Sequence, residues 1–496
     1  MALNLLYANP RRFGFTANLL AFLAKGITYM LRLFRHYVPR SLMWLGAGEI
    51  LVLMSSCYIA LSIVLENQNG NQAHSETLSS LMMYTFIFVG VMVFSLFASG
   101  LYQLRLADNL RSTMLRLIVS ILIGGLLTVV LFALTPTNWI APNVIVVCFA
   151  TTLTGLVGTR LVFYSVCDAS TLRRQVLVIG TGNRAAQLAK DFNHGLIRGI
   201  DICGFVPVGD HNNQRINKND IIIPEGEILS LVARLKIDEI VIALDDRRGN
   251  LPAEQILECK MCGTPVTELL DFFERHTGAI SLESLKPSSM IFSDGFSRAA
   301  MGNWRKRTFD LLASTLLLIF ALPIMLFTAA AIWLESWGRD PVFYRQTRVG
   351  KHGQPFQILK FRSMHRCAES NGAQWAAAND SRVTFVGQFI RQTRIDELPQ
   401  LLNVFRGEMS FVGPRPEHPE FVENLKESIP FYDIRHKTLP GITGWAQVCY
   451  PYGASIDDAR RKLQYDLYYM KNRSLFLDLT ILFQTTHVCL WCQGAR

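Results

Sequence analysis

The segment RQTRIDELPQLLNVFRGEMSFVGPRPEHPEF, residues 391–421, carries two adjacent acids, Asp396 and Glu397, directly before a Leu-Pro pair and an apolar run. Proline is well tolerated in the first turn of a helix, so we expect both acids at or just before a helix N-terminus. Free backbone N–H groups and the helix dipole favour a bound anion there. Neighbouring helix residues project about 100° apart, so the two carboxylates should have different tasks. One could attack phosphorus while the other holds a divalent metal ion.

Three arginines, Arg391, Arg394 and Arg415, flank the acid pair. A guanidinium group can hold two phosphate oxygens through parallel hydrogen bonds, so these side chains suit a diphosphate. A solvated helix cap is the ordinary explanation of a lone Asp-Glu pair. A catalytic role for the acid pair therefore has to be supported by other motifs in the chain.

This segment resembles the bacterial sugar transferase family, the monotopic phosphoglycosyl transferases that prime surface glycans on polyprenyl phosphate. Five further motifs similar to those of the family follow one another along the last two fifths of the chain. They are RKRTFD (305–310), FYRQTRVG (343–350), LKFRSM (359–364), PGITGWAQV (440–448) and YDLYY (465–469). Five ordered matches are far more specific than any one of them.

The resemblance implies transfer of a hexose-1-phosphate from a UDP-sugar to undecaprenyl phosphate, with release of UMP and a covalent aspartyl-phosphosugar intermediate. It favours UDP-glucose or UDP-galactose as donor, in exopolysaccharide or O-antigen synthesis. It makes Asp396 the nucleophile and Glu397 a ligand of Mg²⁺. The side chains expected to contact the diphosphate are Arg394, Arg415, Lys360 and Arg362. For these cations, a surface charge or a structural ion pair stays open as the alternative.

The composition indicates a protein that is associated with a membrane. Half of the 496 residues are hydrophobic and the formal net charge is +10, which suits either nucleic acid or an anionic membrane surface. Four long apolar stretches decide for the membrane and against nucleic acid, because each approaches the ~20 residues that span a bilayer. They are residues 45–65, 81–102, 114–134 and 144–164. Lys and Arg are confined to alternate connections, which predicts that both ends of this bundle face the cytosol.

A soluble domain is predicted after the bundle. The run QVLVIG (175–180) reads as a buried strand, and TGNRAA (181–186) opens a helix with a Gly-x-Gly-x-x-Ala turn. Two interpretations stay open, a nucleotide- or anion-binding regulator and a Rossmann-like scaffold. Both are favoured over a catalytic NAD site, because no acid clearly ends the second strand, where a ribose would be held. A membrane-bound nucleotide-sugar dehydratase or epimerase is the main rival for the whole chain. It would need a Tyr-x-x-x-Lys pair, and the sequence has none.

A fifth apolar segment, residues 309–334, has basic residues on both sides, which predicts that both of its ends stay cytosolic. Pro323 near its middle should kink the helix. A re-entrant helix that enters and leaves on one face satisfies both observations. The alternative is a kinked helix that spans the bilayer, which would place the active site outside, away from nucleotide sugars. Relatives that the chain resembles break this helix at a Ser-Pro pair, whereas Leu322 precedes the proline here. Residues 475–491 are expected to form a further helix lying in the membrane interface, and a packed amphipathic core helix stays open as the alternative.

The predicted fold class is a membrane protein of α and α/β type with five parts. These are a basic cytosolic arm at 1–42, a four-helix transmembrane bundle at 43–168, a Rossmann-like domain at 169–275, a linker at 276–300 and a catalytic domain at 301–496. The predicted location is the bacterial inner membrane, with its lipids as partners and the catalytic domain on the cytosolic face. The bundle and middle domain could also serve homo-oligomer formation. A non-catalytic polysaccharide assembly protein would leave residues 391–421 unexplained.

Overall fold

The computed structural model is described here over part of the chain, and residues 1–29 of the expected basic arm lie outside that part. The described residues are 30–33, 36–67, 74–102, 110–133, 142–167, 173–195, 197, 199–208, 215–224, 226–246, 251–285, 287–293, 295–296, 300–365, 382–450, 453 and 455–490. They form two compact units. The first holds the chain up to Gly278 except residues 34–36 and 97–100, and the second holds those residues and Ala279–Arg496. Strands β1 (Met30–Leu33) and β2 (His36–Pro39) form a small two-stranded sheet.

The first unit begins with four apolar helices. They are α2 (Arg40–Asn67), α3 (His74–Ala98), α4 (Leu110–Ala133) and α5 (Pro142–Cys167). Leu53, Phe88 and Leu156 are buried among them, whereas many other large apolar side chains of the same helices are exposed. Exposed apolar surface of this extent is what a hydrocarbon environment requires. Inside the bundle, Arg160 Nε lies 2.6 Å from Glu49 Oε1, so the buried charges are paired.

Four helices of the described residues are long and apolar enough to cross a membrane. They are Leu42–Ala60, Arg111–Ala133, Ile145–Tyr164 and Trp304–Glu335. The second predicted stretch, residues 81–102, corresponds to the shorter apolar segment Met82–Ala98 of α3. Length and composition thus agree with a membrane protein, and the fourth candidate belongs to the second unit.

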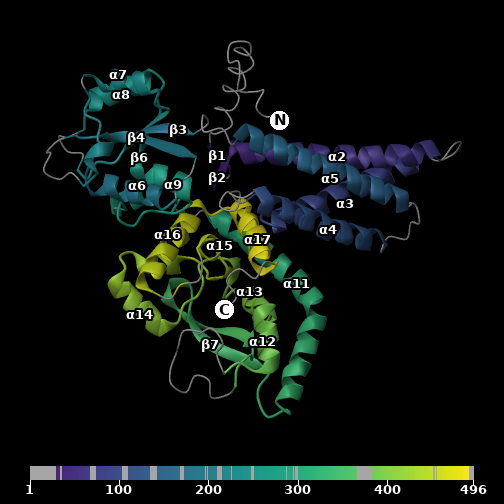
Figure 1. Cartoon of the computed structure of the whole chain (residues 1–496). Helices are drawn as coiled ribbons and strands as arrows, with labels where there is room; N and C mark the ends of the chain where they lie inside the picture. Colours follow the sequence, from purple (N-terminus) through teal and green to yellow (C-terminus); the bar gives the residue numbers. More distant parts are fainter. Residues whose placement is uncertain are drawn as a thin grey trace. The chain divides into compact units, whose positions relative to one another are not determined.

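A parallel four-stranded sheet completes the first unit, in the order β4-β3-β5-β6. Its strands are β3 (Arg174–Ile179), β4 (Ile200–Val206), β5 (Glu239–Ile242) and β6 (Val266–Glu268). Its helices are α6 (Asn183–Asn193), α7 (Ile228–Leu235), α8 (Ala253–Met261) and α9 (Leu269–Thr277), and η5 (Lys218–Asp220) is a short 3₁₀ turn. Figure 1 shows α7 and α8 on one face of the sheet and α6 and α9 on the other. The buried side chains of β3 face both helical layers, as a parallel sheet requires.

The Gly-x-Gly-x-x-Ala turn joins β3 to α6, and an acid of this same unit occupies its anion position. The carboxylate of Asp245 accepts hydrogen bonds from Asn183 N at 2.8 Å and Arg184 N at 3.0 Å. A Cβ atom on Gly182 would lie 2.3 Å from Asp245 Oδ2, so only glycine admits this contact. The helix N-terminus that a pyrophosphate occupies in a dinucleotide site is therefore capped by the protein itself.

The second unit begins with the short helix α10 (Pro287–Phe292) and the long helix α11 (Ala300–Glu335). Helix α11 is one run of 36 residues and contains Pro323. At 1.5 Å per residue it is roughly 54 Å long, well beyond the ~30 Å of a bilayer core. Figure 1 shows that it changes direction along its length, as expected of a helix with an internal proline.

The remaining elements of the second unit lie along one side of α11 (Figure 1). Strands β7 (Phe343–Val349) and β8 (Pro355–Phe361) form an antiparallel hairpin, and β9 (Ser410–Val412) pairs in parallel with β10 (Gly441–Thr443). The helices are α12 (Phe385–Gln392), α13 (Gln400–Arg406), α14 (Pro419–Ser428), α15 (Trp445–Cys449), α16 (Ile456–Asn472) and α17 (Leu475–Leu490). The 3₁₀ turns are η6 (Lys351–Gly353), η7 (Ile395–Glu397) and η8 (Tyr432–Lys437).

Candidate active site

The acid pair lies in a tight connection between two short helices. Helix α12 ends at Gln392, the 3₁₀ turn η7 carries Asp396 and Glu397, and α13 follows from its cap residue Pro399. This agrees with the expectation that the acids stand just before a helix. Arg394, immediately before η7, has a φ of 59°, a left-handed conformation that non-glycine residues seldom adopt. Backbone strain of this kind is typical of sites where geometry matters more than stability.

Glu397 is held by two of the predicted cations. Its Oε1 atom lies 3.2 Å from Lys360 Nζ and 3.3 Å from Arg415 Nη2. Burial alone would raise the pKa of Glu397, but Lys360, Arg415 and Arg394 outweigh burial and lower that pKa to about 2. Glu397 is therefore a permanent anion at neutral pH and a suitable ligand for a cation.

Asp396 differs from its neighbour in environment. Its side chain is buried, with 9% of the residue exposed. Burial and the negative charge of Glu397 raise the pKa of Asp396, while Lys360, Arg394 and Arg391 act in the opposite direction. Two adjacent carboxylates thus have pKa values shifted in opposite directions. Such a split is typical of paired acids with separate chemical roles.

The structure brings together most of the predicted phosphate-binding residues. Lys360 and Arg415 contact Glu397 directly, and Arg394 is close enough to shift the pKa values of both acids. Arg362 lies elsewhere: its Nη1 atom is 3.2 Å from Asp340 Oδ2. Burial lowers the pKa of Arg362. Among the described residues, its ion pair is with Asp340 and not with Asp396 or Glu397. This position fits the alternative role stated above for these cations, that of a structural ion pair.

Asn403 is a site residue that the sequence concealed. It lies in the apolar run after Pro399, yet 1% of it is exposed and its side chain is fully engaged. Its amide oxygen accepts from Leu359 N at 3.0 Å, and its amide nitrogen donates to Gln357 O at 2.8 Å. These bonds fasten α13 to β8, the strand that carries Lys360. The sequence signal that could have identified Asn403 is a single polar residue within an apolar run.

A buried ion pair holds the backbone of Arg415 in place. Arg435 donates to the Arg415 carbonyl at 2.9 Å and to the hydroxyl of Tyr432 at 2.6 Å. Its guanidinium also pairs with Asp466 of the YDLYY motif at 3.0 Å. Asp466 therefore reaches the acid pair through Arg435 and the backbone of Arg415.

The motifs around Gly413 and Gly441 meet through backbone contact. Gly413 N donates to Thr443 O at 2.9 Å, and Gly441 N donates to Pro414 O at 3.0 Å. A Cβ on Gly441 would lie 2.1 Å from Gly413 N, so a larger residue cannot fit there. This close packing fixes the start of the loop that carries Arg415.

Comparison with known proteins identifies the family and several relatives of this chain. The family model for bacterial sugar transferases matches residues 301–492. A UDP-N-acetylgalactosamine-undecaprenyl-phosphate N-acetylgalactosaminephosphotransferase from Aeromonas hydrophila is 43% identical over 263 residues, which is 53% of this chain and 61% of the relative. An undecaprenyl-phosphate glucose phosphotransferase from Komagataeibacter xylinus is 34% identical over 327 residues, 63% of this chain and 58% of the relative.

A shorter relative is covered more completely. A UDP-glucose:undecaprenyl-phosphate glucose-1-phosphate transferase from Caulobacter vibrioides is 44% identical over 193 residues, 38% of this chain and 72% of the relative. The chain belongs to the bacterial sugar transferase family. It spans only about three fifths of the length of the Aeromonas and Komagataeibacter relatives.

The donor atoms present would suit a Mg²⁺ ion that is also bound by substrate phosphates. Among the described residues, no group of three or more His, Cys, Asp or Glu side chains could hold a metal ion. Mg²⁺ is commonly bound by one or two carboxylates together with substrate phosphates and water, and so does not need such a cage. Glu397, ionised and adjacent to Asp396, supplies a ligand of the right kind.

Proposed function

We propose that this chain transfers a sugar-1-phosphate from a UDP-sugar to undecaprenyl phosphate and releases UMP, starting the synthesis of a surface glycan. The observation that carries the proposal is the split acid pair: a buried Asp396 beside a Glu397 clamped by Lys360 and Arg415. Two further observations support the proposal. The chain belongs to the bacterial sugar transferase family, and it has apolar helices long enough to cross a membrane.

Asp396 is the proposed nucleophile. A carboxylate oxygen attacks the β-phosphorus of the UDP-sugar, and the bond from that phosphorus to the bridging oxygen breaks, so that UMP leaves. An oxygen of undecaprenyl phosphate then attacks the same phosphorus and expels the Asp396 carboxylate. The product is undecaprenyl-diphosphate-sugar. Burial of Asp396 leaves its carboxylate poorly solvated, which suits attack on an anionic substrate.

The cations around the acids have a second proposed role. Arg394, Arg415 and Lys360 would bind diphosphate oxygens, and contact with Glu397 aligns Lys360 and Arg415 before substrate arrives. Mg²⁺, held by Glu397 and the diphosphate, would neutralise charge that develops on the leaving group. Arg362 has no proposed phosphate contact, because its guanidinium pairs with Asp340.

The membrane geometry supports this assignment of substrates. Both flanks of α11 are basic and Pro323 lies within it, so we propose that it re-enters the membrane on the cytosolic side of the inner membrane. Residues 301–496 would then form the catalytic domain, with α17 lying in the interface. The lipid phosphate and the soluble UDP-sugar would reach the acid pair from the same side. The bundle at 43–168 and the Rossmann-like domain at 169–275 are proposed as attached, non-catalytic parts.

The direct test is release of UMP by the purified chain with undecaprenyl phosphate and Mg²⁺. The donor panel is UDP-glucose, UDP-galactose, UDP-N-acetylgalactosamine and UDP-N-acetylglucosamine, since the relatives named above differ in their sugars. We expect UMP with one donor well above the others, and a lipid product that carries that sugar. Silence with every donor would instead favour a non-catalytic assembly protein.

A further inference from the structure

A cavity of the unit Ala279–Arg496 lies at the opposite end of α13 from the acid pair. Its volume is about 220 Å³. The charged side chains that line it are Lys306, Arg307, Asp310, Lys351, Lys437 and Arg473. Arg307 donates to the carbonyls of Val404 at 2.7 Å and Phe405 at 2.8 Å, at the C-terminal end of α13. The acids precede the N-terminal end, roughly 10 Å away along a seven-residue helix.

The lining of this cavity is strongly cationic and partly fixed. Five cations line it beside one carboxylate, Asp310, which accepts from Phe411 N at 3.2 Å. Lys306 lies 2.8 Å from Asp478, so one more acid is engaged nearby. Counting both acids, the positive charges still exceed the negative ones by three. A cavity of this sign and size suits a phosphate group.

The cavity also lies where a membrane surface should be. Helix α11 becomes apolar at Phe309, two residues after Arg307, and α17 begins at Leu475, two residues after Arg473. The polar ends of two apolar helices therefore meet at the cavity. Trp304, one turn before the apolar stretch, is 68% exposed, as is common for tryptophan at a membrane interface.

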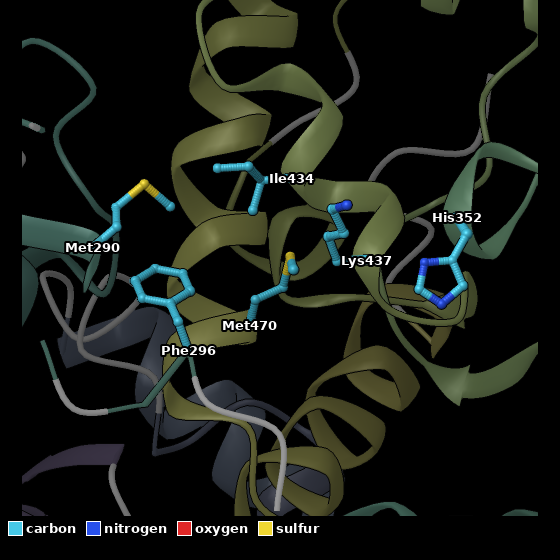
Figure 2. A pocket seen from close by; sticks show the side chains of 6 residues that line it. All are labelled: Met290, Phe296, His352, Ile434, Lys437 and Met470. Carbon is cyan, nitrogen blue, oxygen red and sulfur yellow. The ribbon is translucent and has the colours of Figure 1, made fainter. Parts of the chain in front are cut away.

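An apolar surface adjoins the cationic one. A larger open cavity of about 610 Å³ is lined by Met290, Phe296, Ile434 and Met470, and it shares Lys437 with the first. Figure 2 shows Lys437 between His352 and this apolar group. A phosphate next to an apolar trough is the chemistry of a lipid rather than of a free anion.

We propose that the cationic cavity binds the phosphate headgroup of an anionic membrane lipid, whose hydrocarbon lies along the adjoining apolar cavity. This goes beyond the proposed function, because the bound phosphate lies at the far end of α13 and does not react with Asp396. The site would hold the catalytic unit at a fixed depth and orientation on the membrane surface.

The test uses the full chain in a neutral detergent and measures dissociation constants by titration calorimetry. The probes are dihexanoyl phosphatidic acid, dihexanoyl phosphatidylcholine and inorganic phosphate, each below any micelle-forming concentration. We expect the phosphatidic acid to bind at least about tenfold more tightly than either other probe. Inorganic phosphate binding equally well would overturn the lipid assignment. The readout does not depend on turnover, so it stands apart from the proposed enzyme activity.

A charge-matched pair of double variants localises the site. Lys351→Gln with Lys437→Gln removes two exposed cations of the lining, so folding should be preserved. Lys426→Gln with Arg460→Gln removes two exposed cations of the same unit that lie outside it. We expect the first variant, and not the second, to lose at least about tenfold in affinity for the phosphatidic acid. Equal losses in both would mean unspecific attraction and would end the proposal.

Discussion

The guanidinium of Arg435 and the carboxylate of Asp466 lie 3.0 Å apart, and both side chains are buried. Arg435 in turn donates to the backbone carbonyl of Arg415, whose side chain contacts Glu397. The YDLYY motif thus acts on the acid pair from a distance, through one arginine and one peptide group. Asp466 is a positioning residue in this arrangement, and it does not touch the reacting atoms.

Asp466→Asn should expose this dependence. Removing one partner of a buried ion pair leaves the other charge uncompensated, which costs about 3–5 kcal/mol. We expect faster amide hydrogen exchange around residues 415 and 435, with a raised KM for the UDP-sugar. Asp457→Asn, which affects an exposed pair at 3.5 Å on the same helix, is the control and should change little. Equal exchange rates in the two variants would contradict the positioning role.

Asp396→Asn should abolish turnover, because an amide oxygen cannot form the acyl-phosphate. We expect a loss of at least about 10³-fold in UMP release and no sugar-phosphate adduct by intact mass measurement. The amide has nearly the shape of the acid, so thermal unfolding should be unchanged or slightly improved. Near-normal UMP release from this variant would remove Asp396 from the mechanism.

Glu397→Gln should act on the metal dependence. The amide is a weaker ligand than a carboxylate, so the Mg²⁺ concentration for half-maximal activity is expected to rise by about tenfold or more. The variant also releases Lys360 and Arg415 from their shared partner. A normal Mg²⁺ titration would exclude Glu397 as ligand, whatever happened to the overall rate.

Lys360→Met should move the pH profile. Lys360 lowers the pKa of both acids, so its removal raises them and more of each is protonated at a given pH. Activity that needs both ions should then fall at a higher pH than in the unaltered chain. In the unaltered chain, the stability that ionised Glu397 contributes is lost as the pH falls through its folded pKa of about 2; in the variant this loss should occur at a higher pH. Arg460→Met, on the exposed side of α16, should leave the acid limb in place.

Asp245→Ala should loosen the start of α6. The loss of a carboxylate that accepts two backbone N–H groups costs about 0.5–2 kcal/mol, as for other helix caps. Hydrogen exchange at residues 183–186 should accelerate by about two- to thirtyfold. Asp201→Ala, which removes an exposed pair with Arg173 at 3.3 Å, should leave these amides unaffected. Unchanged exchange in the Asp245 variant would show that the cap is dispensable.

The sequence predicted those features that depend on local pattern. Apolar run length identified the candidate membrane helices, and the glycine turn with its flanking strand indicated a parallel sheet. Local pattern could not indicate which distant groups meet. Lys360 and Arg362 stand two positions apart in one motif, yet Lys360 contacts Glu397 whereas Arg362 pairs with Asp340. Asn403 was read as part of an apolar run because its partners on β8 are more than forty residues away.

The cap that Asp245 forms at the start of α6 bears on whether nucleotides can bind to the middle domain. A nucleotide phosphate would have to evict a resident anion before it could bind at α6, and like charges resist sharing so small a space. The domain keeps the outline of a dinucleotide-binding turn, and the Asp245 carboxylate occupies the position that a phosphate would take. We therefore expect the stability of this domain to depend little on cellular dinucleotide levels, which would suit an architectural role in a membrane assembly.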